Sequence, residues 1–263
     1  MIPPAYVTEW REHAPWPSDD QVEQDLIISR VLVELYGQPE IREALAFRGG
    51  TALAKLYLGP AYRYSEDVDL VQLRAEPIGP TLKAMREVLD SWLGPPSWKH
   101  TFASVKLIYR IALGRNATNQ RRLKLEINTR EHESVFGLTA RNLTVESRWF
   151  TGSAAVTTYE LEELLATKLR ALYQRKKGRD LFDLATALTG EKIDPERVVE
   201  GFIRYLEREG RRISRVEFEG NLAEKIRDVD FLADVPNLVA TDTEYDVVEA
   251  ADRVRENLLS RLD

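Results

Sequence analysis

One segment of this 263-residue chain restricts its fold and chemistry more than any other. Residues 47–53 read FRGGTAL, and residues 63–70, after a short spacer, read RYSEDVDL. In the first stretch, Gly49 and Gly50 end a short apolar run, and the residues that follow predict a helix with Thr51 as its N-cap. The free backbone N–H groups at the start of that helix, together with the helix dipole, would favour a bound phosphate.

The second stretch places acidic side chains at alternate positions. If residues 63–70 are extended, Ser65, Asp67 and Asp69 all point to one face. Two carboxylates on one face of a strand can share divalent cations, which stabilise charge on phosphate oxygens. The alternative is an ordinary turn followed by an acidic loop. Either stretch taken alone would favour this alternative. The two halves in this order favour a site that transfers a nucleotidyl group.

These stretches, together with ATKL at residues 166–169 and RDLFDL at residues 179–184, resemble the AbiEii/AbiGii toxin family of nucleotidyltransferases. The resemblance covers roughly residues 20 to 190. It implies an α/β (α+β) fold with a DNA-polymerase-β-like core and a mixed sheet, a need for an NTP and Mg²⁺ or Mn²⁺, and the role of toxin beside a cognate antitoxin. Some members add nucleotides to the 3′ end of tRNA and stop translation, so the resemblance also implies an RNA acceptor.

Two residues depart from the pattern of the wider superfamily. Thr51 stands where serine is frequent, and Glu126 stands where the third carboxylate is often aspartate. Threonine keeps a hydroxyl and glutamate keeps a carboxylate, so the needed chemistry is retained while the metal geometry could differ.

Glu126 lies in a stretch with strand periodicity. Residues 123–128 read LKLEIN, in which apolar and polar side chains alternate. If the apolar side packs on helices, Glu126 points to the opposite face and could reach a metal with Asp67 and Asp69. A solvent-facing charge is the alternative, and the periodicity leaves both open. The resemblance favours the metal ligand.

Composition narrows the ligand chemistry. The chain has no cysteine and three scattered histidines, so a metal would need oxygen ligands. A signal-peptide pattern and an apolar run of membrane-spanning length are both absent, which predicts a cytoplasmic protein with no membrane partner. The net charge of −6 argues against non-specific binding to nucleic acid by bulk charge. Basic runs at residues 121–124, 170–179 and 211–215 could hold phosphates locally, with solvated helix ends as the alternative.

The chain is expected to divide into a nucleotidyltransferase core over residues 1–156 and a helical C-terminal domain over residues 157–263. A capping box at Ser18 predicts the first core helix, and a second capping box at residues 157–160 predicts the start of the C-terminal domain. A further helix is expected over residues 81–93, and strand alternation over residues 105–111.

The C-terminal domain contributes Lys168 and Asp183 to the predicted site. Lys168 falls in the middle of an apolar stripe of leucines, so a buried ammonium there would need a carboxylate or a substrate phosphate as partner. A stem packed on the stripe with its head in water is the alternative. Asp183 lies off the apolar face of the next helix and could be solvated or paired. The resemblance implies that Lys168 contacts phosphate and that Asp183 is functional.

The predicted reaction assigns a role to each of these groups. Asp67 and Asp69 hold metal, and Glu126 completes the site or activates the acceptor hydroxyl. The nucleotide is bound by Gly49, Gly50, Thr51, Ser65 and Lys168. A rival enzyme hypothesis keeps the fold but changes the acceptor to a protein or a small molecule such as an aminoglycoside. A third hypothesis is a non-catalytic module in which the acidic strand binds a structural ion and the helical tail binds a partner.

Overall fold

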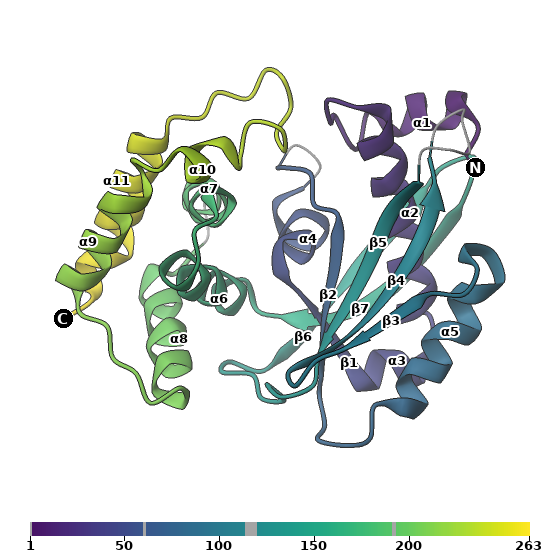
Figure 1. Cartoon of the computed structure of the whole chain (residues 1–263), viewed down its shortest axis with the longest axis horizontal. Coiled ribbons are helices and arrows are strands. Elements are labelled where there is room, and N and C mark those ends of the chain that lie inside the picture. Colours follow the sequence, from purple (N-terminus) through teal and green to yellow (C-terminus); the bar gives the residue numbers. More distant parts are fainter. Residues whose placement is uncertain (1, 60–61, 114–119, 191–192) are drawn as a thin grey trace. The chain divides into compact units, whose positions relative to one another are not determined.

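The computed structural model describes residues 2–59, 62–113, 120–190 and 193–263 (Figure 1). The chain divides into two compact units. Unit 1 consists of Met1–Glu133 and Leu138–Tyr159, and unit 2 consists of Ser134–Gly137 and Glu160–Asp263. Each unit is described by itself.

Unit 1 is built on a mixed sheet of seven strands in the order β3-β4-β5-β2-β1-β7-β6. Its central pairs β2–β5 and β1–β7 are parallel, and the other pairs are antiparallel. The expected strand at residues 105–111 is confirmed as β4 and the one at residues 123–128 as β5. The strands are β1 (Leu45–Arg48), β2 (Asp67–Gln72), β3 (Ser97–His100), β4 (Ser104–Ala112), β5 (Gln120–Asn128), β6 (Leu138–Glu146) and β7 (Thr151–Tyr159).

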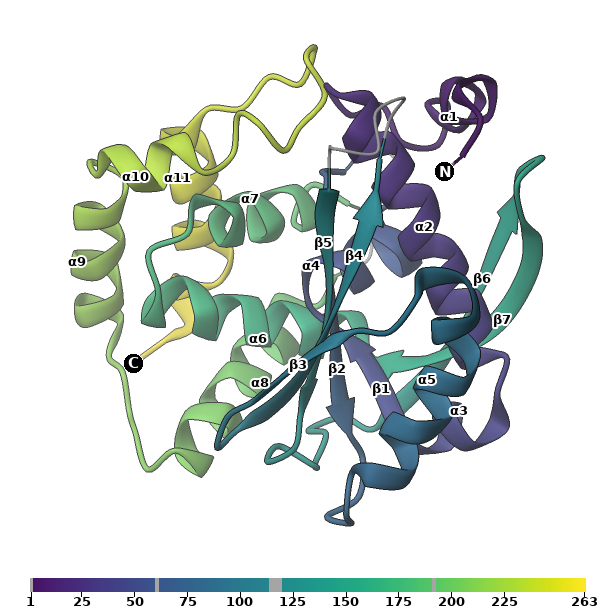
Figure 2. The same ribbon diagram turned by 45° about the vertical axis from the view of Figure 1, so that its right-hand side comes forward.

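Helices α2, α3 and α5 lie together along one face of this sheet (Figure 2). The capping box that begins α2 is confirmed, because the Ser18 hydroxyl accepts from the backbone N–H of Gln21 while the Gln21 side chain accepts from the backbone N–H of Ser18. The helix expected from residue 81 is α5, which begins two residues earlier. The helices of unit 1 are α1 (Pro4–Trp10), α2 (Asp19–Tyr36), α3 (Pro39–Ala44), α4 (Gly49–Leu53), the π-helical turn η1 (Ala54–Leu58) and α5 (Gly79–Leu93).

The central strands of the sheet have one apolar face and one polar face. Leu123, Leu125 and Ile127 of β5 are fully buried, as the alternation predicts. Glu126 and Asp67, on the opposite face, keep side-chain exposures of 25% and 37%. The sheet therefore presents charged groups on the face that α2, α3 and α5 leave uncovered.

Unit 2 is helical, as expected for the C-terminal region. Helix α6 packs against α7 and α8, and α11 packs against α7. No helix within the described ranges combines the length and the apolar character needed to cross a membrane. The elements are α6 (Leu161–Gln174), α7 (Gly178–Ala187), α8 (Pro195–Arg208), α9 (Arg215–Lys225), α10 (Val229–Ala233), α11 (Val247–Asn257) and the 3₁₀ turn η2 (Leu259–Arg261).

The capping box expected at residues 157–160 is wrong. Strand β7 continues to Tyr159, and the N-cap of α6 is Glu160, whose side chain makes no capping bond. The two threonine hydroxyls bind carbonyls of other elements instead, because Thr157 donates to the Arg42 carbonyl of α3 at 2.8 Å and Thr158 donates to the Phe47 carbonyl of β1 at 2.7 Å. Pairing with distant strands has overridden a local helix signal.

We expect Gly178→Ala to destabilise unit 2. A Cβ atom at Gly178 would lie 2.2 Å from the backbone carbonyl oxygen of Phe231, which cannot easily move aside. The free energy of unfolding should fall by about 1–3 kcal/mol. Gly220 in α9 has open space at the corresponding position, so Gly220→Ala should be neutral or raise stability by up to about 1 kcal/mol. Urea unfolding of both variants measures the difference, and equal stabilities would contradict the close approach.

Candidate active site

The turn between β1 and α4 is closely packed against the acidic strand. Gly49 has a φ of +83°, and a Cβ atom there would lie 2.5 Å from Asp69 Oδ2. A Cβ atom on Gly50 would lie 2.3 Å from Nη2 of Arg63, a buried arginine. The two glycines therefore let the Asp69 carboxylate and the Arg63 guanidinium approach the backbone. The two sequence motifs therefore pack directly against each other.

Thr51 is not the N-cap of the following helix. Helix α4 begins at Gly49, its N-cap is Arg48, and no side chain caps it. The Thr51 hydroxyl instead donates to Ser65 Oγ at 2.7 Å and lies within hydrogen-bonding distance of the Asp67 carbonyl oxygen. It thus connects α4 to the entrance of β2, which begins at Asp67, two residues after Ser65.

The registers of the central strands bring the predicted carboxylates together. Asp69 of β2 lies opposite Glu126 of β5, and Asp67 lies opposite Lys124. On the far side of β5, Lys106 of β4 lies opposite Glu126. Because directly opposite residues share a face, Asp67, Asp69 and Glu126 project from the same polar face of the sheet. The fold thus supports the predicted grouping of these three residues.

Two lysines that the sequence analysis did not single out bind these carboxylates. Lys124 Nζ lies 2.9 Å from Asp67 Oδ2 and 3.3 Å from Glu126 Oε2. Lys106 Nζ lies 2.9 Å from Glu126 Oε1, and the Ser104 hydroxyl donates to the same oxygen at 2.9 Å. Both lysines lie on the polar side of a strand alternation, and Lys124 also belongs to the basic run at residues 121–124, but neither signal identified their carboxylate partners.

These contacts shift the pKa values of Glu126 and Lys124. Partial burial works against the charged form of Glu126, but hydrogen bonds from Lys106 and Ser104 and the charges of both lysines outweigh it and lower its pKa. Partial burial likewise works against the ammonium of Lys124, but its hydrogen bond to Asp67 and the surrounding carboxylates raise its pKa. Glu126 is therefore an anion and Lys124 a cation at neutral pH.

Buried polar groups of α2 hold the entrance of the site. The Gln24 amide donates to the carbonyls of Glu66 and Arg122 at 3.3 and 3.4 Å, which fixes the start of β2 beside β5. Lys55 Nζ, in the turn after α4, lies 2.6 Å from Asp25 Oδ1 of α2. The α2 helix therefore positions both the acidic strand and the segment after the Gly-Gly turn, a role that its amphipathic pattern did not reveal.

The donor set suits a hard divalent cation. Carboxylate oxygens are the ligands that Mg²⁺ and Mn²⁺ prefer, and an ammonium already lies between two of the carboxylates. Over the described residues, no three histidine, aspartate or glutamate side chains stand close enough to form a ready-made metal site. The residues fit a cation in kind, but side-chain rearrangement is needed to bring their oxygens to one ion.

Lys168 is buried in unit 2 with two carboxylates as partners. Its Nζ lies 3.1 Å from Asp180 Oδ1 and 2.8 Å from Asp183 Oδ2, and both aspartates are fully buried. Arg175 also binds Asp180, with Nε 2.7 Å from Oδ2. The anionic partner that the sequence required is thus a carboxylate pair, and Asp183 is buried rather than solvated.

These charges also act on Asp180, a residue that the sequence analysis did not include in the predicted site. Burial alone would raise its pKa, but the charges of Lys168 and Arg175 outweigh burial and lower it. The N-cap of α7 is Lys177, and Asp180 is the third residue of this helix. The signal for its role was the RDLFDL motif itself.

The basic runs are largely neutralised by acidic neighbours. Arg121 lies 3.7 Å from Asp20, and in unit 2 Lys176 pairs with Asp228 at 2.7 Å. Further pairs hold Arg170 to Glu209, Arg179 to Asp234 and Arg215 to Glu219. Several basic residues of these runs are therefore engaged in ion pairs, and the run at residues 121–124 lies on strand β5 rather than at a helix end.

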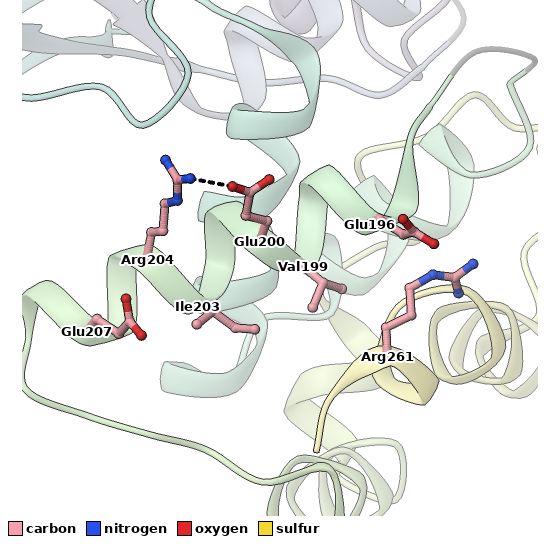
Figure 3. Close-up of a pocket in the computed structure, with 7 residues that line it drawn as sticks. All are labelled: Glu196, Val199, Glu200, Ile203, Arg204, Glu207 and Arg261. Atoms are coloured by element: carbon pink, nitrogen blue, oxygen red, sulfur yellow. Dashed lines mark hydrogen bonds and ion pairs between the residues drawn. The ribbon is translucent and has the colours of Figure 1, made fainter.

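A separate hollow of about 560 Å³ lies over α8 in unit 2 (Figure 3). Arg204 in this hollow is paired with Glu200. The three glutamates of the lining would repel a triphosphate. Its lining residues are Glu196, Val199, Glu200, Ile203, Arg204, Glu207 and Arg261. This hollow therefore offers no chemistry for the predicted reaction.

The fold is shared with solved structures. MenT4, a nucleotidyltransferase toxin from Mycobacterium tuberculosis H37Rv, superposes with a TM-score of 0.67 at 18% identity and covers 100% of this chain and 91% of its own. JHP933 from Helicobacter pylori superposes with a TM-score of 0.56 at 20% identity and covers 90% of this chain and 89% of its own. The expected α/β fold with a nucleotidyltransferase core is confirmed.

The sequence comparison defines the family. Residues 30–256 match the family of the nucleotidyl transferase AbiEii toxin of type IV toxin–antitoxin systems. The chain belongs to this family and is a nucleotidyltransferase toxin of such a system. The match continues beyond residue 190, where the resemblance was expected to end, so the family pattern includes α8 to α10 and most of α11. No curated protein matches the sequence significantly.

We expect Lys168→Met to destabilise the protein by about 3–5 kcal/mol, because it leaves two buried carboxylates without their shared cation. Adding Asp183→Asn should recover part of the loss. Lys176→Met removes a lysine whose side chain is half exposed and should change stability little. Chemical denaturation of the three variants is the measurement. Unchanged stability of Lys168→Met would show that the buried pairing is not structural.

Proposed function

We propose that this toxin transfers a nucleotidyl group from an NTP to an RNA, with the 3′ end of tRNA as the acceptor, and so blocks translation. The observation that carries the proposal is the strand register, which groups Asp67, Asp69 and Glu126 on one polar face. The Gly49 turn packs directly against Asp69, so groups suited to phosphate lie beside groups suited to a cation.

In this proposal Asp67, Asp69 and Glu126 would hold Mg²⁺, with Mn²⁺ as a substitute. When bound, the cation would neutralise charge that develops on the phosphate oxygens. Backbone N–H groups at the first turn of α4, at Gly49 and Gly50, lack partners within the helix and would donate to the triphosphate.

The hydroxyls of Thr51 and Ser65 are hydrogen-bonded to each other at the mouth of this turn. In the proposed complex they would help to orient the phosphates beside the two glycines. Glu126 is ionised at neutral pH and could accept the proton of an acceptor hydroxyl if it does not serve only as a metal ligand.

In this proposal Lys168 would contact a substrate phosphate and Asp183 would also take part in the site. Lys168 could contact a phosphate only by weakening its bonds to Asp180 and Asp183. Its effect on transfer must therefore be measured together with its effect on stability.

An exposed arginine pair supports a polyanionic acceptor. Arg110 of β4 and Arg122 of β5 lie directly opposite each other, on the same face as Lys106 and Lys124, and both are exposed. Like charges directly opposite on a sheet repel. An RNA phosphate bound between them would relieve that repulsion, whereas a neutral protein side chain would not.

Sequencing of RNA 3′ ends after induced expression in a bacterial host tests the acceptor. Untemplated nucleotides on tRNA are the expected result. Transfer from labelled NTP to total RNA, protein extract and small molecules such as aminoglycosides, run in parallel, separates the rival acceptors. Failure to bind any NTP in the presence of Mg²⁺ would favour the non-catalytic module.

We expect Asp67→Asn and Asp69→Asn each to reduce transfer on the order of a hundredfold or more and to relieve toxicity, because an amide is a poor ligand for Mg²⁺. Thermal unfolding should change little, since Asp67 is partly exposed. Asp230→Asn, the same change at an exposed position of α10, is the control and should transfer normally. Full activity of Asp67→Asn would remove this residue from the site.

A further inference from the structure

A lysine ammonium occupies the space between two of the proposed metal ligands. Lys124 projects from β5 on the polar face, directly opposite Asp67. Its Nζ is 2.9 Å from Asp67 Oδ2 and 3.3 Å from Glu126 Oε2, so it bridges the two carboxylates. The other oxygen of Glu126 is held separately by Lys106 and Ser104.

This bridge has an electrostatic reason. The carboxylates of Asp67, Asp69 and Glu126 share one partly buried face, where like charges repel more strongly than in water. Lys124 places a positive charge among them, 2.9 Å from Asp67 Oδ2 and 3.3 Å from Glu126 Oε2. The lysine therefore stabilises the acidic face when no other cation is there.

The same bridge is incompatible with a divalent cation shared by these carboxylates. Mg²⁺ takes its oxygen ligands at about 2.0–2.1 Å. An ion on Asp67 Oδ2 and Glu126 Oε2 would lie next to the ammonium and would repel it. The lysine stem is flexible, so its head can swing away while the strand stays in place.

We propose that Lys124 is a tethered cation that holds the carboxylate site in the metal-free protein and is displaced when a divalent cation binds. The inference rests on the proposed metal role of Asp67, Asp69 and Glu126. It implies that Lys124 weakens metal binding to the nucleotide-free protein. A displaced ammonium beside Asp67 would be available to a triphosphate, so the nucleotide would favour metal binding by attracting the lysine away.

Binding of Mn²⁺ to the nucleotide-free protein, followed by the electron paramagnetic resonance signal of the free ion, tests this competition. Lys124→Met should bind Mn²⁺ on the order of tenfold more tightly than the wild type. Lys99→Met is the matched control. Lys99 lies on the same sheet face, opposite Lys106, and one strand farther from Glu126. Its removal should change the affinity by less than about twofold, because solvent and salt screen exposed charges.

Thermal unfolding gives a second readout that does not depend on transfer. Without metal, Lys124→Met should melt below the wild type, and Mn²⁺ should raise its melting temperature by more than it raises that of the wild type. Lys124→Gln repeats both measurements if the methionine variant folds poorly. Lys124→Arg, which keeps the charge, should not bind Mn²⁺ more tightly than the wild type.

Equal Mn²⁺ affinities of the wild type and Lys124→Met would overturn the inference and leave the proposed metal site standing. A second outcome would overturn both the metal site and the inference. In that outcome, neither the wild type nor Lys124→Met shows Mn²⁺ binding that is lost when Asp67→Asn is introduced. These two failures are distinguishable because the second needs the aspartate variant and the first does not.

Discussion

The parallel pairing of β2 with β5 is the interaction on which the site depends. It sets Asp69 opposite Glu126 and Asp67 opposite Lys124. A slip of one residue would turn the charged side chains of β5 toward the helices and its buried leucines outward. The cost of burying those charges excludes the slipped arrangement. The apolar face thus fixes the register, and the register fixes the distances between charges on the polar face.

The polar face is balanced across the strands. Asp69 and Glu126 lie opposite each other in a cross-strand row, with Arg48 next to Asp69 on one side and Lys106 next to Glu126 on the other. Arg48 is itself held by Glu131, with Nη1 2.7 Å from Oε2; burial opposes its charge, but this ion pair outweighs burial and raises its pKa. Basic residues therefore flank the two central carboxylates, and Lys124 bridges Glu126 to Asp67.

Sequence alone could predict much of this arrangement. The alternation in residues 123–128 was enough to predict a strand with Glu126 away from the core, and it is confirmed. The sequence did not reveal β1, β3, β6 and β7, or which strands pair, because those features depend on contacts between distant residues. The failed capping box at residues 157–160 has the same origin. The carboxylate contacts of Lys106 and Lys124 were not predicted, because lysines are common on the polar face of a strand and the sequence does not show which residue lies opposite.

The prediction for unit 2 was limited by a different assumption. Helical periodicity assumes one buried face, but α7 packs against both α6 and α11, so Asp183, placed off the main stripe, is buried as well. Two carboxylates and two cations then form a compact group in which Lys168 holds both aspartates and Arg175 holds one. Such a group helps to specify how α6 and α7 pack. A phosphate contact would compete with this pairing, so a loss of transfer in a Lys168 variant indicates a substrate role only where it exceeds the loss explained by unfolding.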